Sequence, residues 1–228
     1  MRQTEIPTHV GLIMDGNGRW AKKRLMPRSV GHGAGMNRLI ELSSHAKERG
    51  VKYLTVYALS TENLQSRPKD ELEGLFNLIR KYFTENLEKL YAEGAAVKVI
   101  GDLSPLPGDV QTLLKDGENN SPRDAEFTLV FAINYGSRAE IVHAAQLAAA
   151  KGEITADSVS ANLYTAGLPD PDLIIRTGGE VRLSNFLTFQ AAYAELYFTK
   201  TLFPDFGKKQ FDKALLSFSK RERRFGGV

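Results

Sequence analysis

Short apolar runs alternate with helix-like segments along the whole sequence, and this alternation limits the chain to few folds. Each run is nearly continuous and ends at glycine or polar residues that favour a turn. Runs without polar alternation are typical of strands buried on both faces, as in parallel sheets. The predicted strands are residues 9–14, 53–59, 97–100, 127–133, 173–175 and 196–198.

The segments between these runs have helical periodicity. The longest predicted helix covers 69–93, where apolar residues recur at i, i+3, i+4 and i+7. Further helices are expected over 37–49, 138–151 and 208–220. The order of strands and helices predicts an α/β fold with right-handed crossovers and helices flanking a mostly parallel sheet. Ligands in such folds bind beyond the carboxyl ends of the strands.

Composition sets the class of protein. Hydrophobic residues make up 42% and charged residues 25%, which allows an ordinary core and one domain over 1–228. We expect residues 1–8 to be flexible and residues 221–228 to form a basic tail. The absence of cysteine excludes disulfides, cysteine–zinc sites and thiol catalysis. The start has no apolar signal core and no run approaches a membrane span, so a cytoplasmic protein is expected.

The first candidate site follows the run at 9–14. Asp15 is followed by two glycines that free the backbone, and then by a basic segment with Arg19, Arg28 and His32. Free N–H groups at such a turn and charged donors around it can hold an anion. An acid among these donors suggests a bridging Mg²⁺. The alternative is a tight turn before a solvated basic helix. The mildly basic sequence pI near 9.0 agrees with an anionic ligand without naming it.

A second candidate site follows the run at 173–175, where Arg176 precedes two glycines, Arg182 and Ser184. Arginine forks suit phosphate oxygens, although these arginines could instead pair with Glu180 and Asp172. Two such strand ends predict two anionic groups bound side by side. The wide apolar faces of the nearby helices predict that at least one of these anionic groups carries an apolar tail.

Three further segments leave alternatives open. Residues 60–63 (STEN) also follow a strand and could be a helix N-cap or a catalytic group. Glu195 could be a metal ligand or a paired acid. The basic residues 221–224 could be a solvated tail, a phosphate-binding patch or a dimer contact.

Long motifs carry a family resemblance that covers residues 9–227. They are HVGLIMDGNGRWAKKR, GH at 31–32, YALSTEN, INYGSR, DLIIRTGGEVRLSNF, YAELYF, and PDF followed by RERRFGG. In these motifs the chain resembles the cis-prenyltransferases, closest to those of the undecaprenyl diphosphate synthase type. The resemblance implies an α/β homodimer with a central six-stranded sheet and an apolar tunnel.

The implied reaction is the Mg²⁺-dependent condensation of isopentenyl diphosphate onto an allylic diphosphate such as farnesyl diphosphate. The implied product is a long Z-polyprenyl diphosphate such as undecaprenyl diphosphate, a lipid carrier precursor for cell-wall synthesis. This product would partition to the membrane, which places the enzyme in the cytoplasm or at the inner membrane face. The alternative is a short- or medium-chain synthase with the same active site.

The resemblance also implies roles for single residues. Asp15 matches the essential acid that handles Mg²⁺, Glu195 matches a second metal ligand, and Asn63 matches a proposed proton acceptor. The allylic diphosphate cradle is matched by Gly16, Asn17, Gly18, Arg19, Arg28 and His32. Trp20 and Arg67 match substrate-pocket residues, with Ser60, Thr61 and Glu62 beside Asn63. The isopentenyl diphosphate site is matched by Arg176, Arg182, Leu183 and Ser184.

The sequence departs from the family pattern at three points. Leu64 replaces the tryptophan that usually follows the asparagine, and one inserted residue precedes Arg67. Val181 stands where the family often has histidine. These changes are expected to affect chain-length preference or turnover.

Two other functions are weighed against this one. A nucleic-acid-binding module is suggested by the basic pI, but the basic residues are spread among acids without an aromatic platform. No nucleic-acid partner is therefore expected. A non-catalytic subunit is disfavoured because Asp15, Asn63, Arg176 and Arg182 are all retained.

Overall fold

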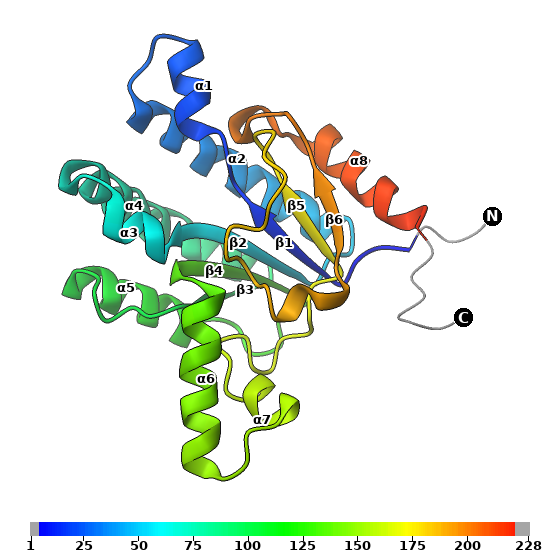
Figure 1. The fold of residues 1–228 in the computed structure, drawn as a ribbon. Helices are drawn as coiled ribbons and strands as arrows, with labels where there is room; N and C mark the ends of the chain where they lie inside the picture. The colour runs from blue at the N-terminus through cyan, green and yellow to red at the C-terminus, as the bar shows by residue number, and fades with distance from the viewer. Residues whose placement is uncertain (1–4, 222–228) are drawn as a thin grey trace.

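The computed structural model describes residues 5–221, in which six strands form one sheet whose pairs are all parallel (Figure 1). The strand order is β3-β4-β2-β1-β5-β6, so the strand nearest the N-terminus lies inside the sheet. The strands are β1 (His9–Ile13), β2 (Tyr53–Ser60), β3 (Ala95–Ile100), β4 (Phe127–Tyr135), β5 (Leu173–Arg176) and β6 (Glu195–Phe198). The six predicted strands are confirmed, with boundaries shifted by one or two residues.

Helices cover both faces of the sheet (Figure 1). Those of the described chain are α1 (Asn17–Lys23), α2 (Arg28–Glu48), α3 (Thr61–Ser66), α4 (Lys69–Ala92), α5 (Gly108–Asn119), α6 (Ser137–Lys151), α7 (Ala156–Ser160) and α8 (Lys208–Ser219). Two 3₁₀ turns, η1 (Gln190–Tyr193) and η2 (Phe203–Asp205), complete the described elements. The predicted long helix is confirmed as α4. The predictions had no counterpart for α5.

The helix expected over 37–49 was placed wrongly at its start, because α2 begins at Arg28. The glycines at 31 and 35 suggested a turn, yet both lie inside the helix and are buried. A Cβ at Gly31 would lie 2.1 Å from the carbonyl oxygen of Asn17, and one at Gly35 would lie 2.5 Å from the Asn17 side-chain oxygen. Glycine is present here because α1 approaches α2 closely, which outweighs its low helix propensity.

The core lies on both faces of the sheet because strand side chains alternate in direction. Val10 and Leu12 of β1 join the larger apolar cluster with α2, α4 and α8, while Ile13 joins a smaller cluster on the other face. All five residues of β1 are buried, as the continuous apolar run predicted. Since β2, β1 and β5 are neighbours and parallel, the residues that follow them meet at one edge of the sheet.

Candidate functional site

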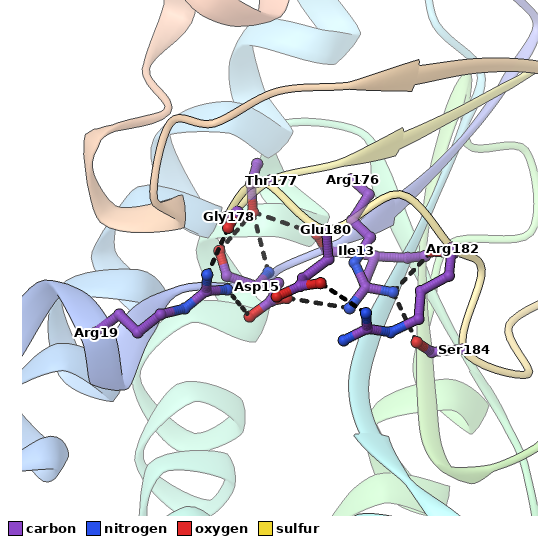
Figure 2. Close-up of polar contacts among 9 residues, drawn as sticks. All are labelled: Ile13, Asp15, Arg19, Arg176, Thr177, Gly178, Glu180, Arg182 and Ser184. Atoms are coloured by element: carbon purple, nitrogen blue, oxygen red, sulfur yellow. Dashed lines mark hydrogen bonds and ion pairs between the residues drawn. The ribbon is translucent and has the colours of Figure 1, made fainter.

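The residues that follow β1 and β5 contact one another at this edge (Figure 2). The carboxylate of Asp15 accepts a hydrogen bond from Arg19 Nη2 at 2.7 Å and one from Arg176 Nη2 at 3.0 Å. Arg19 comes from the first turn of α1, four residues after Asp15, and Arg176 is the last residue of β5. One carboxylate thus holds two guanidinium groups from different strand ends.

The loop after β5 fixes both arginines. Arg176 Nη1 donates to the carbonyl of Arg182 at 2.7 Å and to the Ser184 hydroxyl at 2.6 Å. Arg19 Nη1 donates to the carbonyl of Gly178 at 2.5 Å. The hydroxyl of Thr177 donates to the carbonyl of Asp15 at 2.7 Å. Because Arg176 is only 5% exposed, its fork is held in one position.

The two arginines also set the charge state of Asp15. Burial alone would raise the pKa of this carboxyl, but hydrogen bonds and charge from Arg19 and Arg176 outweigh burial and lower the pKa below its ordinary value. The carboxylate is therefore ionised at neutral pH. Its side chain keeps 28% of its surface exposed, and it faces two cavities.

The first cavity, of about 650 Å³, lies over the turn between β1 and α1. Gly16 adopts a left-handed conformation with φ 114°, and no side chain caps α1 within the described structure. The polar lining of this first cavity includes Asp15, Gly16, Asn17, Gly18, Arg19, Arg28, His32 and Arg67. The predicted cradle residues thus share one cavity.

Three of these side chains surround Glu71 of α4. Arg67 Nη1 lies 2.5 Å from one carboxylate oxygen of Glu71, Arg28 Nη1 lies 3.5 Å from the other, and His32 Nε2 lies 3.9 Å away. Burial, followed by the charge of Arg67, lowers the pKa of His32 to about 4. His32 is therefore neutral at pH 7, and the cationic groups here are Arg28 and Arg67.

The second cavity, of about 610 Å³, lies between β2, α3 and the loop after β5. Ser60 is the N-cap of α3 and accepts a hydrogen bond from the Asn63 backbone N–H at 3.1 Å, which confirms the capping interpretation. Glu62 accepts a hydrogen bond from the Asn185 side chain at 2.9 Å. The polar lining of the second cavity includes Asp15, Asn17, His32, Ser60, Glu62, Asn63, Arg67, Arg176, Ser184 and Asn185. The two cavities share the Asp15 carboxylate.

An apolar hollow of about 70 Å³ continues from these cavities toward the core. The predicted lining from α4 and β4 is confirmed, including Tyr82, Phe83 and Phe131, while α2 contributes Met36 and Leu39. The centroids of the three aromatic rings in this lining lie 5.2 to 5.9 Å apart. The volume of the hollow is small beside those of the two polar cavities.

Five predicted residues lie outside the described linings of the two polar cavities. The indole N–H of Trp20 donates to Asp205 at 2.7 Å, and Arg24 stacks 4.0 Å from the ring centroid. Thr61 instead packs against Gly136. The others in this group are Leu183, which packs on the smaller core cluster, and Glu195.

Arg182 also lies outside these linings. Its guanidinium pairs with Glu180 at 2.6 Å, the alternative considered from the sequence, while its carbonyl holds Arg176.

Glu195 is placed at the start of β6, opposite Leu173, whereas Phe198 pairs with Arg176. Three residues of strand, about 10 Å, thus separate the backbone of Glu195 from the level of Arg176. The carboxylate of Glu195 accepts a hydrogen bond from Arg221, so the first residue of the expected basic tail contacts this acid. Residues 222–228 lie outside the described part of the chain.

The chemistry of Asp15 fits a magnesium ion. Among residues 5–221, no group of three or more acids or histidines is arranged to hold a metal by itself. Mg²⁺ commonly uses one or two carboxylates and completes its shell with water and substrate phosphates. A single ionised carboxylate facing two cavities meets the protein's part of that requirement, and water or phosphate oxygens of a ligand would complete the shell.

Three residues that contact the site were not predicted from the sequence. Thr177 ties β5 to the Asp15 backbone, Glu71 binds two cations of the first cavity, and Asn185 bridges Glu62 and the Arg138 backbone. Each had a signal in the sequence, because Thr177 and Asn185 follow predicted site residues directly and Glu71 stands four residues after Arg67.

The chain is similar to known prenyltransferases over nearly its full length. The family model described as "Putative undecaprenyl diphosphate synthase" matches residues 13–226. An isoprenyl transferase of Streptococcus mutans is 48% identical, with 100% of this chain and 96% of that protein aligned. One from Brucella suis is also 48% identical, over 97% of this chain and 90% of that protein.

Two solved structures share the fold. Lavandulyl diphosphate synthase from Lavandula x intermedia, in complex with dimethylallyl diphosphate, superposes with a TM-score of 0.93 and 36% identity, covering 97% of this chain and 98% of that one. A probable undecaprenyl diphosphate synthase from Campylobacter jejuni gives a TM-score of 0.83 and 34% identity, covering 98% and 100%.

Proposed function

This chain belongs to the undecaprenyl diphosphate synthase family of cis-prenyltransferases, and on that premise we propose that it condenses isopentenyl diphosphate onto an allylic diphosphate in repeated steps. The observation that carries the proposal is the Asp15 carboxylate, held by Arg19 and Arg176 between two cavities. The reaction needs two diphosphates with their reacting carbons adjacent, and two cavities that share a wall suit that need.

We assign the allylic diphosphate to the cavity over Gly16–Arg19. Backbone N–H groups at the start of α1, together with Arg19, Arg28 and Arg67, supply donors and positive charge. When the allylic C–O bond breaks, its electron pair leaves with the diphosphate, and these groups stabilise the growing negative charge. They stabilise the transition state more than the ground state because the charge on the bridging oxygen increases.

We assign isopentenyl diphosphate to the cavity beside Arg176 and Ser184. The double bond attacks the allylic carbon, and a proton is then lost from the adjacent carbon. The side chain of Asn63 lines this cavity and can orient that proton toward a diphosphate oxygen. A neutral amide is too weak a base to hold the proton, so its destination is the more basic phosphate.

We propose that Asp15 would hold Mg²⁺, which would supply positive charge against the diphosphates. Arg19 and Arg176 keep the Asp15 carboxylate ionised and oriented toward both cavities. Glu195 remains a second proposed metal ligand. Its position at the other end of β5–β6 requires a rearrangement or a second subunit for it to reach Asp15.

The growing chain enters the apolar hollow between α2 and α4 in this proposal. Each buried CH₂ contributes about 0.8 kcal/mol, which drives the tail inward as the chain lengthens. A long product such as undecaprenyl diphosphate, with a role in cell-wall synthesis, requires α2 and α4 to separate. The small volume of this hollow, which Tyr82, Phe83 and Phe131 line, favours the alternative of a short- or medium-chain product, as does the likeness to lavandulyl diphosphate synthase.

We also propose that the protein acts as a homodimer in the cytoplasm and releases its product to the membrane. Exposed Val142 and Leu147 on α6 support an interface there, since large apolar side chains in contact with water favour association. Within the described chain, no helix combines the length and apolar character that crossing a bilayer requires.

Product analysis tests the proposed activity. The purified protein is incubated with dimethylallyl, geranyl or farnesyl diphosphate, labelled isopentenyl diphosphate and Mg²⁺, and product lengths are resolved by chromatography and mass spectrometry. We expect Z-configured products that EDTA abolishes. Products that stop after one to a few additions support the short-chain alternative. No elongated product with any primer would refute the proposed function.

A further inference from the structure

Residues 22–30, here called the α1–α2 tip, are all exposed, which is unusual because the tip contains three large apolar side chains. Leu25 is 97% exposed, Met26 45% and Val30 44%. Single exposed apolar residues are ordinary on a protein surface, but a group of three within six positions suggests contact with an apolar phase.

The backbone conformation of Leu25 gives a second reason to expect that its exposed side chain makes a contact. Met26 N–H donates to the carbonyl of Ala21 at 3.0 Å, and Leu25 N–H donates to that of Lys22 at 3.2 Å, the pattern of a Schellman motif ending α1. Leu25 occupies the left-handed position of that motif with φ 55°, where glycine is the ordinary residue. Leucine is strained in this conformation, and its side chain gains no packing in exchange. Folding of the monomer does not explain its presence.

The charge around these apolar residues has one sign. The tip carries four cationic residues, Lys22, Lys23, Arg24 and Arg28, and no acidic residue. Arg24 is bound to Asp205 and stacked on Trp20, but Lys22 and Lys23 have no ion-pair partner among the described residues. Arg28 keeps 64% of its side chain exposed. Exposed apolar residues beside free lysines are complementary to an anionic lipid surface, where the lysines contact headgroups.

The position of the tip in the molecule also favours contact with lipid. Figure 1 shows α1 and its connection to α2 at one extremity of the molecule, opposite α6 and α7. Lys22, Leu25, Met26 and Pro27 line the cavity assigned to the allylic diphosphate, so the tip forms one wall of that cavity. That cavity shares Asn17 and His32 with the apolar hollow. A membrane at the tip would therefore lie next to the cavity that we assign to the diphosphate of the growing chain.

We propose that the α1–α2 tip docks on an anionic lipid bilayer, with Leu25 and Met26 entering the interface and Lys22 and Lys23 contacting headgroups. This inference rests on the proposed function for its purpose, since a hydrophobic product needs a membrane. The contact itself requires no substrate.

Vesicle co-sedimentation without substrate tests the docking. The full chain is mixed with vesicles of phosphatidylcholine alone or with one quarter phosphatidylglycerol, at low and high salt. We expect binding to the anionic vesicles that weakens with salt. Leu25→Gly should lower the partition coefficient about fivefold or more. Its melting temperature should be unchanged or higher, because glycine relieves the left-handed strain. Lys23→Gln should weaken anionic-vesicle binding by about fivefold.

Matched controls are available outside the tip. Ile154→Gly removes another exposed apolar side chain from a loop, and Lys81→Gln removes an exposed lysine from α4. Both should bind vesicles as the parent protein does. Equal binding by Leu25→Gly and the parent, or equal loss in Ile154→Gly, overturns the proposal. Tip-dependent retention on polyglutamate but not on vesicles also overturns it, in favour of an acidic protein partner. Chain elongation in detergent is assayed separately, so its failure would remove the proposed activity and leave the binding result unchanged.

Discussion

Asp15 and Arg176 stand 161 positions apart in the sequence, yet their side chains pair at 3.0 Å where two neighbouring strands end. Parallel pairing of β1 with β5 brings them together, with Ile13 opposite Arg176. The same guanidinium reaches Ser184, so one arginine connects the acid of the first cavity to the loop of the second. This pair joins the two proposed diphosphate sites.

Asp15→Asn should lower turnover at least about 100-fold while the protein stays folded, because the amide cannot hold a cation between two diphosphates. The free energy of unfolding should fall by only about 1–2 kcal/mol, since the carboxylate is partly solvated. Steady-state kinetics and thermal melting measure the two effects. Asp157→Asn on α7 is the matched control. Near-parental turnover in Asp15→Asn would exclude the proposed metal role.

Arg176→Lys should raise the KM for isopentenyl diphosphate at least about tenfold and change that for the allylic substrate less than about twofold. Lysine keeps the charge but loses the fork that binds Asp15, Ser184 and the Arg182 carbonyl together. Arg80→Lys is the control, because Arg80 of α4 is half-buried, pairs with Glu73 and Asp109, and lines neither polar cavity. Equal changes in both KM values would contradict the separate assignment of the two cavities.

Tyr82→Ala should shift products toward longer chains, because it enlarges the apolar hollow that Tyr82 lines. A stability loss of about 3–5 kcal/mol accompanies the cavity. Tyr82→Phe is the comparison, because the Tyr82 hydroxyl is buried without a hydrogen-bond partner among the described residues. Tyr82→Phe should keep the product length and leave the melting temperature unchanged or higher. An unaltered product distribution in Tyr82→Ala would show that this wall does not limit chain length.

His32 should make stability depend on pH between about 6.5 and 4. Its pKa is lowered to about 4 in the folded protein, so the unfolded chain binds the proton more readily in this window. Stability therefore falls as pH decreases from 7 to 5, by about 2 kcal/mol from this group. His9, whose pKa burial also lowers, adds to the parental slope. Denaturant unfolding of His32→Gln at both pH values should show a shallower dependence; an identical slope would contradict a neutral His32.

The fold was predictable because buried strands appear in the sequence as apolar runs, such as 127–133, and because helix 69–93 shows clear periodicity. The start of α2 was not predictable, because Gly31 and Gly35 allow close contact with Asn17, a residue from another element. Helix α5 was missed because glycines occupy positions 108 and 117. Gly117 lies beneath Phe83, where a Cβ would come within 2.9 Å of the ring.

The candidate site was likewise predictable from the sequence only in part. Asp15, Arg19 and Arg176 were predictable because glycine-rich strand ends in a parallel sheet converge on one edge. The position of Trp20 was not, because its partner Asp205 lies 185 residues away. The contact of Glu71 with Arg28 and His32 depends on how α4 packs against α2, which no local pattern encodes.

A crystal structure of the protein with Mg²⁺, isopentenyl diphosphate and an unreactive thio-analogue of farnesyl diphosphate tests the central claim most directly. The account predicts two diphosphates on either side of the Asp15 carboxylate, one against Gly16–Arg19 and the other against Arg176 and Ser184. The farnesyl tail should lie between α2 and α4. Diphosphates bound away from Asp15, or a single anion occupying both cavities, would contradict it.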